Sequence, residues 1–292
     1  MRETLTLTIR FIVLTYGIAW ACWGLAWALL VLGTGGQGAD AAQALARALE
    51  YLGTLAPLYV AWRLFPRLAS AGAVCLSAAP SARGHATAAS LDASGRTLGF
   101  WGFMFNPRVR VWGIGAIVTL TLWRYVSFHA ALGFPASVSS ACAAFVAGIP
   151  GLLLGGGLEE PGWRGALQPL LERLVALRWD RGTARRRATL LVPLAVGLVW
   201  GMWHLPLALM PGTYQSVVPF WMVLVAGVGL SYSLAVVRAW SDGVVWCVLC
   251  HMVYNSMLVG IPQDPGRFVA MFAVEAVIGL AVRALQVRRR VV

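Results

Sequence analysis

Long apolar runs separated by short polar or basic segments dominate the chain. Crossing a bilayer takes about 20 helical residues, and runs of that length are found at residues 7–31, 45–65, 111–134, 140–171, 188–210, 216–237, 243–262 and 267–285. The pattern predicts an all-α, polytopic membrane protein built as a bundle of about eight transmembrane helices. We expect residues 1–292 to form a single transmembrane domain with one long cytoplasmic loop at 66–109.

Composition and charge support this interpretation and exclude a nucleic-acid-binding protein. Hydrophobic residues make up 59% of the chain and charged residues 12%. The net charge is +12, and its positive part comes from arginine alone, because the chain contains no lysine. The termini and every second polar gap are arginine-rich, whereas the first, third and fifth gaps contain no arginine and the seventh has Arg267 beside Asp264. The positive-inside rule then places both termini in the cytoplasm. We expect a multi-pass protein of a bacterial inner (cytoplasmic) membrane.

Glycine and proline positions predict where the helices depart from regular geometry. Three consecutive glycines at 155–157 are expected to loosen the fourth helix. Pro193 and Pro206 are expected to kink the fifth helix, because proline removes a helical hydrogen bond. The Gly151/Gly155 and Gly197/Gly201 pairs have the four-residue spacing that lets two helices approach closely.

A charge inside a predicted span costs about 2.5–3.5 kcal/mol. Six polar residues on the fourth, fifth and seventh spans stand out for this reason: Glu159, Glu160, Arg164, His204, His251 and Asn255. Such groups normally face a protein interior or a wet cavity. A rise of about 1.5 Å per residue places Glu159 and His204 some 20–25 Å from the cytoplasmic arginines, and His251 nearer 15 Å from the end of its helix. The difference in depth leaves their convergence open.

Helical spacing assigns these residues to faces. Glu160 and Arg164 are four residues apart and are expected to pair, whereas Glu159 is rotated by about 100° and stays free to act as a base. His251 and Asn255 repeat the four-residue spacing. Trp163 and Trp200 are interpreted as packing residues.

The six residues fit hydrolysis of an amide, which needs a base for water, a proton donor for the leaving amine and donors for the oxyanion. A zinc site is an alternative, because one carboxylate and two histidines can bind zinc, although no H-E-x-x-H helix is present. A non-enzymatic immunity or scaffold protein is the other alternative. In that case the Glu160–Arg164 pair and the histidines are structural.

Three motifs in order resemble the CPBP family of intramembrane proteases, which includes the CAAX-processing endopeptidase and bacterial Abi proteins. "EEPGWR" at 159–164 fits Glu-Glu-x-x-x-Arg, "WGMWH" at 200–204 fits Phe/Trp-x-x-x-His, and "HMVYN" at 251–255 fits His-x-x-x-Asn. The resemblance covers about residues 140–260, the expected motif-bearing core. Trp200 takes the place of the commoner phenylalanine, which is expected to reshape the pocket wall.

The resemblance implies an intramembrane endopeptidase with a water-filled cavity and a membrane-associated peptide or protein as substrate. The residue matching Glu159 would activate water with help from that matching His204, and those matching His251 and Asn255 would stabilise the oxyanion. Glu160 and Arg164 would support the first glutamate. No cofactor is expected on this basis, with zinc as the alternative, and the lipid bilayer is the expected surrounding.

Overall fold

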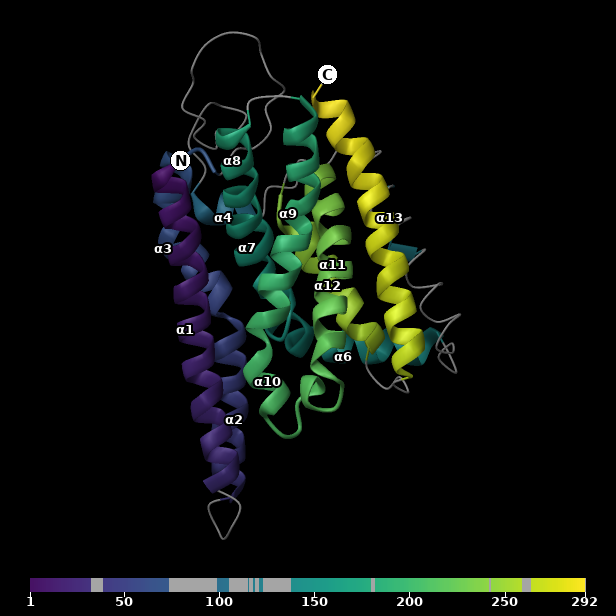
Figure 1. Cartoon of the computed structure of the whole chain (residues 1–292). Helices are drawn as coiled ribbons and strands as arrows, with labels where there is room; N and C mark the ends of the chain where they lie inside the picture. Colours follow the sequence, from purple (N-terminus) through teal and green to yellow (C-terminus); the bar gives the residue numbers. More distant parts are fainter. Residues whose placement is uncertain are drawn as a thin grey trace.

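The computed structural model describes residues 1–32, 39–73, 99–104, 115, 118, 121–122, 138–179, 182–241, 243–258 and 264–291. Within these ranges the protein is helical and contains no strand, which confirms the predicted all-α class (Figure 1). The predicted third span, 111–134, lies almost wholly outside them.

The helices follow one another as a bundle (Figure 1). Their bounds are α1 Arg2–Leu32, α2 Ala39–Thr54, α3 Ala56–Ser70, α4 Phe100–Met104, α6 Val138–Leu154, η1 Gly157–Glu159, α7 Glu160–Gly162, η2 Trp163–Leu167, α8 Gln168–Arg178, α9 Gly182–Trp203, α10 Leu205–Leu209, η3 Tyr214–Ser216, α11 Phe220–Ser241, α12 Val245–Leu258 and α13 Pro265–Val291. The element η2 is a short π-helix, and η1 and η3 are 3-10 turns.

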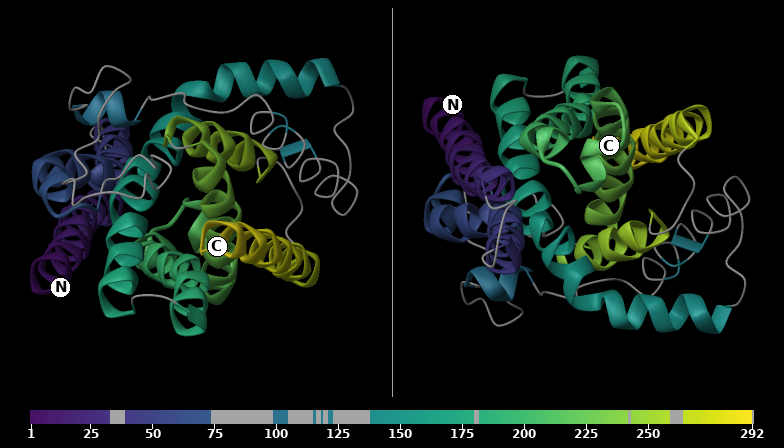
Figure 2. Two further views of the ribbon diagram at one scale, coloured as in Figure 1. Left: turned by 90° about the horizontal axis from the view of Figure 1, so that it is seen from above. Right: turned by 90° about the horizontal axis from the view of Figure 1, so that it is seen from below.

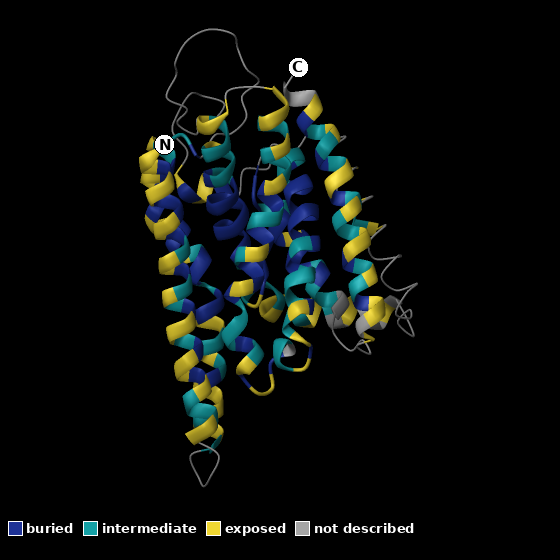
Figure 3. Cartoon of the chain, in the orientation of Figure 1, coloured by how far each residue is buried: buried dark blue, intermediate teal, exposed yellow. Residues whose placement is uncertain are grey.

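Four helical segments of the described residues are long and apolar enough to cross a membrane: Arg2–Leu32, Gly182–Leu209, Phe220–Ser241 and Gly266–Arg288. Large apolar side chains are exposed on the outer faces of α1 and α13, such as Val13 and Val277, while buried residues concentrate in the middle of the bundle (Figure 3). Apolar outer faces suit contact with lipid. The protein is thus a multi-pass membrane protein, and the number of eight crossings stays a prediction.

The second predicted span, 45–65, is interrupted at Leu55, which separates α2 from α3. Helix α3 continues to Ser70, so the segment 66–109, predicted as a loop, begins with helix. Its other described part, α4, is also helical and buries Phe100, Phe103 and Met104. Residues 74–98 and 105–109 of this segment lie outside the described residues.

The fourth predicted span, 140–171, is not one straight helix, and this prediction was wrong. The chain breaks at Gly155 and Gly156, and α6 lies across the bundle, as both views along the bundle axis show (Figure 2). The break leaves carbonyl groups without helical partners, which lipid would not tolerate. The Thr54 hydroxyl of α2 lies 2.6 Å from the Leu154 carbonyl oxygen, and Asn255 Nδ2 of α12 lies 3.5 Å from that of Gly155.

Helix α9 packs closely on α11 through glycine. A Cβ on Gly197 would lie 2.6 Å from Val228 Cα, and one on Gly227 would lie 2.9 Å from the Gly197 carbonyl oxygen. Close approach at the predicted Gly197/Gly201 pair is therefore confirmed. At Gly151 and Gly155, the neighbouring group from another helix is instead the Tyr51 side chain.

The fifth predicted span runs through Pro193 without interruption and breaks at His204, two residues before Pro206. The Trp20 indole of α1 donates a 2.9 Å hydrogen bond to the Trp203 carbonyl at this break. The sequence predicted His204 within a continuous helix. In the structure it lies instead at the junction of α9 and α10.

Candidate active site

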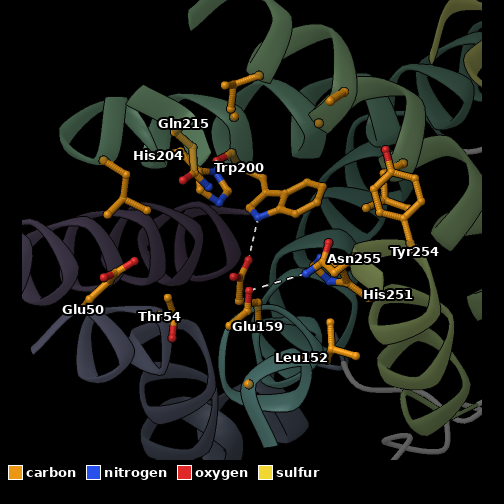
Figure 4. Close-up of a pocket in the computed structure, with 18 of the residues that line it drawn as sticks. Glu50, Thr54, Leu152, Glu159, Trp200, His204, Gln215, His251, Tyr254 and Asn255 are labelled. Atoms are coloured by element: carbon orange, nitrogen blue, oxygen red, sulfur yellow. Dashed lines mark hydrogen bonds between the residues drawn. The ribbon is translucent and has the colours of Figure 1, made fainter. Parts of the chain in front are cut away.

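One cavity collects residues from most of the elements above. It has a volume of about 610 Å³, a size typical of ligand-binding clefts. Glu159, His204, His251 and Asn255 all line it, whereas Glu160 and Arg164 do not. Figure 4 shows Glu159 near the centre, with Trp200 and His204 to one side and His251 and Asn255 to another. The four residues that were separated by nearly a hundred positions share one cavity.

Glu159 is 2% exposed and is held by two indole groups. Trp200 Nε1 donates to Glu159 Oε2 at 2.7 Å, and Trp163 Nε1 donates to the same oxygen at 3.3 Å. Both tryptophans were predicted to be packing residues, and this interpretation is corrected: their N–H groups position the carboxylate. Oε1 receives neither bond.

Glu160 points away from the cavity and forms a buried polar cluster behind it. Its Oε1 accepts a 2.9 Å hydrogen bond from His251 Nδ1, and its Oε2 lies 3.4 Å from Arg164 Nε. The predicted Glu160–Arg164 ion pair is confirmed. The Arg164 guanidinium also lies 5.7 Å from the centre of the Trp200 ring. Because a buried charge is costly unless it is paired, this cluster fixes α7 and η2 against α12 and α9.

The two histidines are oriented by their Nδ1 atoms. His204 Nδ1 lies 2.9 Å from the Trp200 carbonyl oxygen, which can only accept, so His204 donates from Nδ1. His251 donates from Nδ1 to Glu160. In neutral His204, Nε2 therefore carries a lone pair that can accept a proton or a hydrogen bond from water. His251 can donate from Nε2 only when the ring is protonated.

Gly156 is a site residue that the motifs do not include. A Cβ built on it would lie 2.2 Å from Asn255 Nδ2 and 3.1 Å from His251 Nε2. Both nitrogens therefore meet beside one backbone position that has room for no side chain. The triple glycine was predicted to loosen the helix, and only the structure shows that its middle residue makes room for the two donors.

The donor groups do not gather as metal ligands. Among the described residues, no three His, Cys, Asp or Glu side chains lie close enough together to hold a metal ion. Glu160 and His251 face each other, and Glu159 is turned to the two indoles.

A family model matches the part of the chain that carries these residues. Residues 141–257 match the model described as type II CAAX prenyl endopeptidase, Rce1-like. This segment is Rce1-like. All three motifs lie inside the match, so the resemblance drawn from them is confirmed, and the match indicates a CAAX-type protease that acts in a membrane. A search of curated proteins gave no significant match to the chain.

The Rce1-like segment covers most of α6 through α12 but not α2 or α13, which also contribute to the site. Helix α2 lines the cavity with Glu50, Tyr51 and Thr54, and α13 does so with Phe268. None of these four residues was predicted. Their roles follow from packing between distant helices, for which the motifs carry no signal.

Proposed function

We propose that the protein is an intramembrane endopeptidase in which Glu159 activates a water molecule for attack on a peptide bond. The observation that carries the proposal is the meeting of Glu159, His204, His251 and Asn255 in one cavity. A carboxylate removed from bulk water gains basicity toward a bound water molecule, and a closed site strengthens each electrostatic contact within it.

In the proposed reaction, Glu159 takes a proton from water while the water oxygen attacks the carbonyl carbon of the substrate. His204 accepts a hydrogen bond from the same water through Nε2, which its bond to the Trp200 carbonyl leaves unprotonated. The carbon–nitrogen bond then breaks, and the proton on Glu159 passes to the leaving amine. The second proton of the water follows to the amine, so the products are a carboxylate and a protonated amine, and the side chain of Glu159 returns to its first state.

Stabilisation of the oxyanion is assigned to Asn255 and His251. The two donors converge beside Gly156, as an oxyanion site requires. The hydrogen bond from His251 Nδ1 to the Glu160 carboxylate orients the His251 ring, and Arg164 in turn holds Glu160. Glu160 and Arg164 are thus proposed as positioning residues, because neither reaches the cavity.

The purified protein in detergent, incubated with membrane peptides, tests this proposal by mass spectrometry of the products. We expect defined cleavage by the wild type and its loss in Glu159→Ala and His204→Ala. Equal cleavage by all three proteins would overturn the proposal. The thermal midpoint of each variant is measured as well. If Glu159 had a purely structural role, Glu159→Ala would lose cleavage together with a lowered thermal midpoint.

A further inference from the structure

The residues that line the cavity extend from the middle of the bundle, where Leu230 lies halfway along α11, to one of its ends. His204 and Trp200 lie at the C-terminal end of α9, Val223 lies in the first turn of α11, and Phe268 lies in the first turn of α13. Helices α9 and α11 run in opposite directions, so these positions lie at the same end of the bundle (Figure 1).

Arginines gather at the opposite ends of the same helices, with Arg267 in the first turn of α13 as an exception. Arg187 lies near the start of α9, Arg238 in the last turn of α11, and Arg288 near the end of α13. At a rise of about 1.5 Å per residue, His204 lies about 26 Å from Arg187, against a hydrocarbon thickness of about 30 Å. Both termini lie at the arginine-rich end (Figure 1).

Polar residues line the cavity on the side away from the arginine-rich end of the bundle. Glu50 and Tyr51 come from α2, and Gln215 comes from η3, in the connection between α10 and α11. Tyr51 is 41% exposed, and Glu50 pairs with Arg47 at 2.7 Å. In Figure 4, Glu50 and Thr54 lie on one side of Glu159, and Leu152 and Tyr254 lie on the other. The cavity thus has a polar approach at the end of the bundle remote from the termini.

We propose that the catalytic cavity opens toward the non-cytoplasmic side of the membrane, and that its substrate is a membrane-anchored peptide whose scissile bond lies in the non-cytoplasmic half of the bilayer. The arginine-rich end is cytoplasmic by the positive-inside rule, and the cavity lies at the other end. This inference rests on the proposed function for its substrate, but the side on which the cavity opens does not depend on catalysis.

The distance between His204 and the arginine-rich end determines which class of substrate can reach the site. A scissile bond held at the cytoplasmic surface would have to cross most of the hydrocarbon layer before it reached the level of His204, and each uncompensated peptide group costs several kcal/mol there. A peptide that has been inserted or exported meets no such barrier, because the polar approach receives it directly.

Accessible cysteines test the side of opening. The test starts from a variant that lacks all five cysteines, Cys22, Cys75, Cys142, Cys247 and Cys250. Gln215→Cys or Tyr51→Cys then places one cysteine in the cavity. Ala184→Cys places one at the exposed start of α9. A membrane-impermeant maleimide is added to intact spheroplasts of a bacterial host or to inverted vesicles. We expect the two cavity cysteines to react in spheroplasts and Ala184→Cys to react in inverted vesicles. The opposite pattern, or reaction of the cavity cysteines from both sides, would overturn the proposal.

A second measurement keeps the proposal testable if the cysteine-free protein does not fold. A fluorescent protein that matures only in the cytoplasm is fused to the C-terminus of the wild type, at the arginine-rich end. Fluorescence is expected, and its absence from a correctly inserted fusion would contradict the proposed orientation. A protein that is labelled as expected but cleaves no peptide would overturn the proposed function and leave the side of opening intact.

Discussion

Trp200 connects the parts of the candidate site through one side chain. Its indole N–H binds Glu159, its ring lies over Arg164, and its edge meets the ring of His251 with centroids 5.2 Å apart. Its carbonyl oxygen orients His204. The commoner phenylalanine of this motif would preserve the ring contacts and the carbonyl but not the N–H donor.

Replacement of Trp200 by phenylalanine is therefore expected to lower kcat and to leave KM nearly unchanged. A hydrogen bond to a charged group contributes about 1.5–3 kcal/mol, which corresponds to about tenfold or more in rate. Steady-state kinetics on a cleavable peptide measure both constants. Trp203→Phe is the matched control, since Trp203 is also buried and its Nε1 has no hydrogen-bond partner among the described residues. Equal losses in the two variants would argue against a positioning role for the Trp200 N–H.

Gly156→Ala is expected to remove most of the activity, because the added methyl group would fall on Asn255 Nδ2 and crowd His251 Nε2. Loss of one oxyanion donor costs about 10²–10³ in kcat. Gly148→Ala on α6 is the control, since its Cβ meets only Leu152 at an ordinary 3.5 Å. The cleavage rate and thermal midpoint of both variants are measured. Full activity in Gly156→Ala would contradict the assignment of the two donors.

A strong chelator such as 1,10-phenanthroline is expected to leave the cleavage rate unchanged. The reason is the arrangement of the donors in the described part of the chain, in which no three metal-binding side chains converge. Metal content of the purified protein is measured alongside. Loss of activity that zinc restores would favour the zinc-dependent alternative and remove Glu159 as the sole activator of water.

Helical spacing was sufficient to predict the Glu160–Arg164 pair and to distinguish Glu159 from Glu160. It was not sufficient for Trp163 and Trp200, because the direction of an indole N–H depends on which element lies opposite. Trp163 and Glu159 are four residues apart on neighbouring elements, so a pairing could have been considered. The bond from Trp200 crosses between elements and has no sequence signal.

At the scale of elements, the break in the fourth predicted span shows what glycine patterns can and cannot predict. Three glycines indicate a weak point in a helix, but the break persists only because Thr54 and Asn255 lie near the freed carbonyl groups. Those partners come from α2 and α12, which are distant in sequence. The sequence therefore predicts the place of the break and not the turn of α6 across the bundle.

Gly197→Ala tests the close contact of α9 with α11. Alanine normally stabilises a helix relative to glycine by about 1 kcal/mol, but here its Cβ would lie 2.6 Å from Val228 Cα. We expect a lower thermal midpoint in detergent. Gly17→Ala on α1, whose Cβ would meet nothing within 4 Å, is expected to keep or raise the midpoint. A raised midpoint in both variants would show that the two helices do not pack as described.

At the scale of the whole molecule, the alternation of basic and non-basic gaps predicted that the two termini share one end, and the structure agrees (Figure 1). The convergence of the motifs was harder to predict, because helix depth counted along the sequence left His251 apart from Glu159. In the structure, the turn at Gly156 brings the chain beside His251 and removes the difference. A depth calculated from a constant rise per residue cannot include such a turn.

The central claim, that Glu159 is the base within a cavity shared with His204, His251 and Asn255, is tested most directly by the cleavage rate of Glu159→Gln. Glutamine keeps the size of the side chain and an oxygen for the two indoles but cannot take a proton from water, and general-base catalysis contributes about 10²–10⁴ in rate. Glu172→Gln, which removes a carboxylate paired with Arg283 outside the cavity, is the control. We predict a loss of that size in Glu159→Gln at an unchanged thermal midpoint, and near-wild-type cleavage in Glu172→Gln. Wild-type cleavage by Glu159→Gln would contradict the claim.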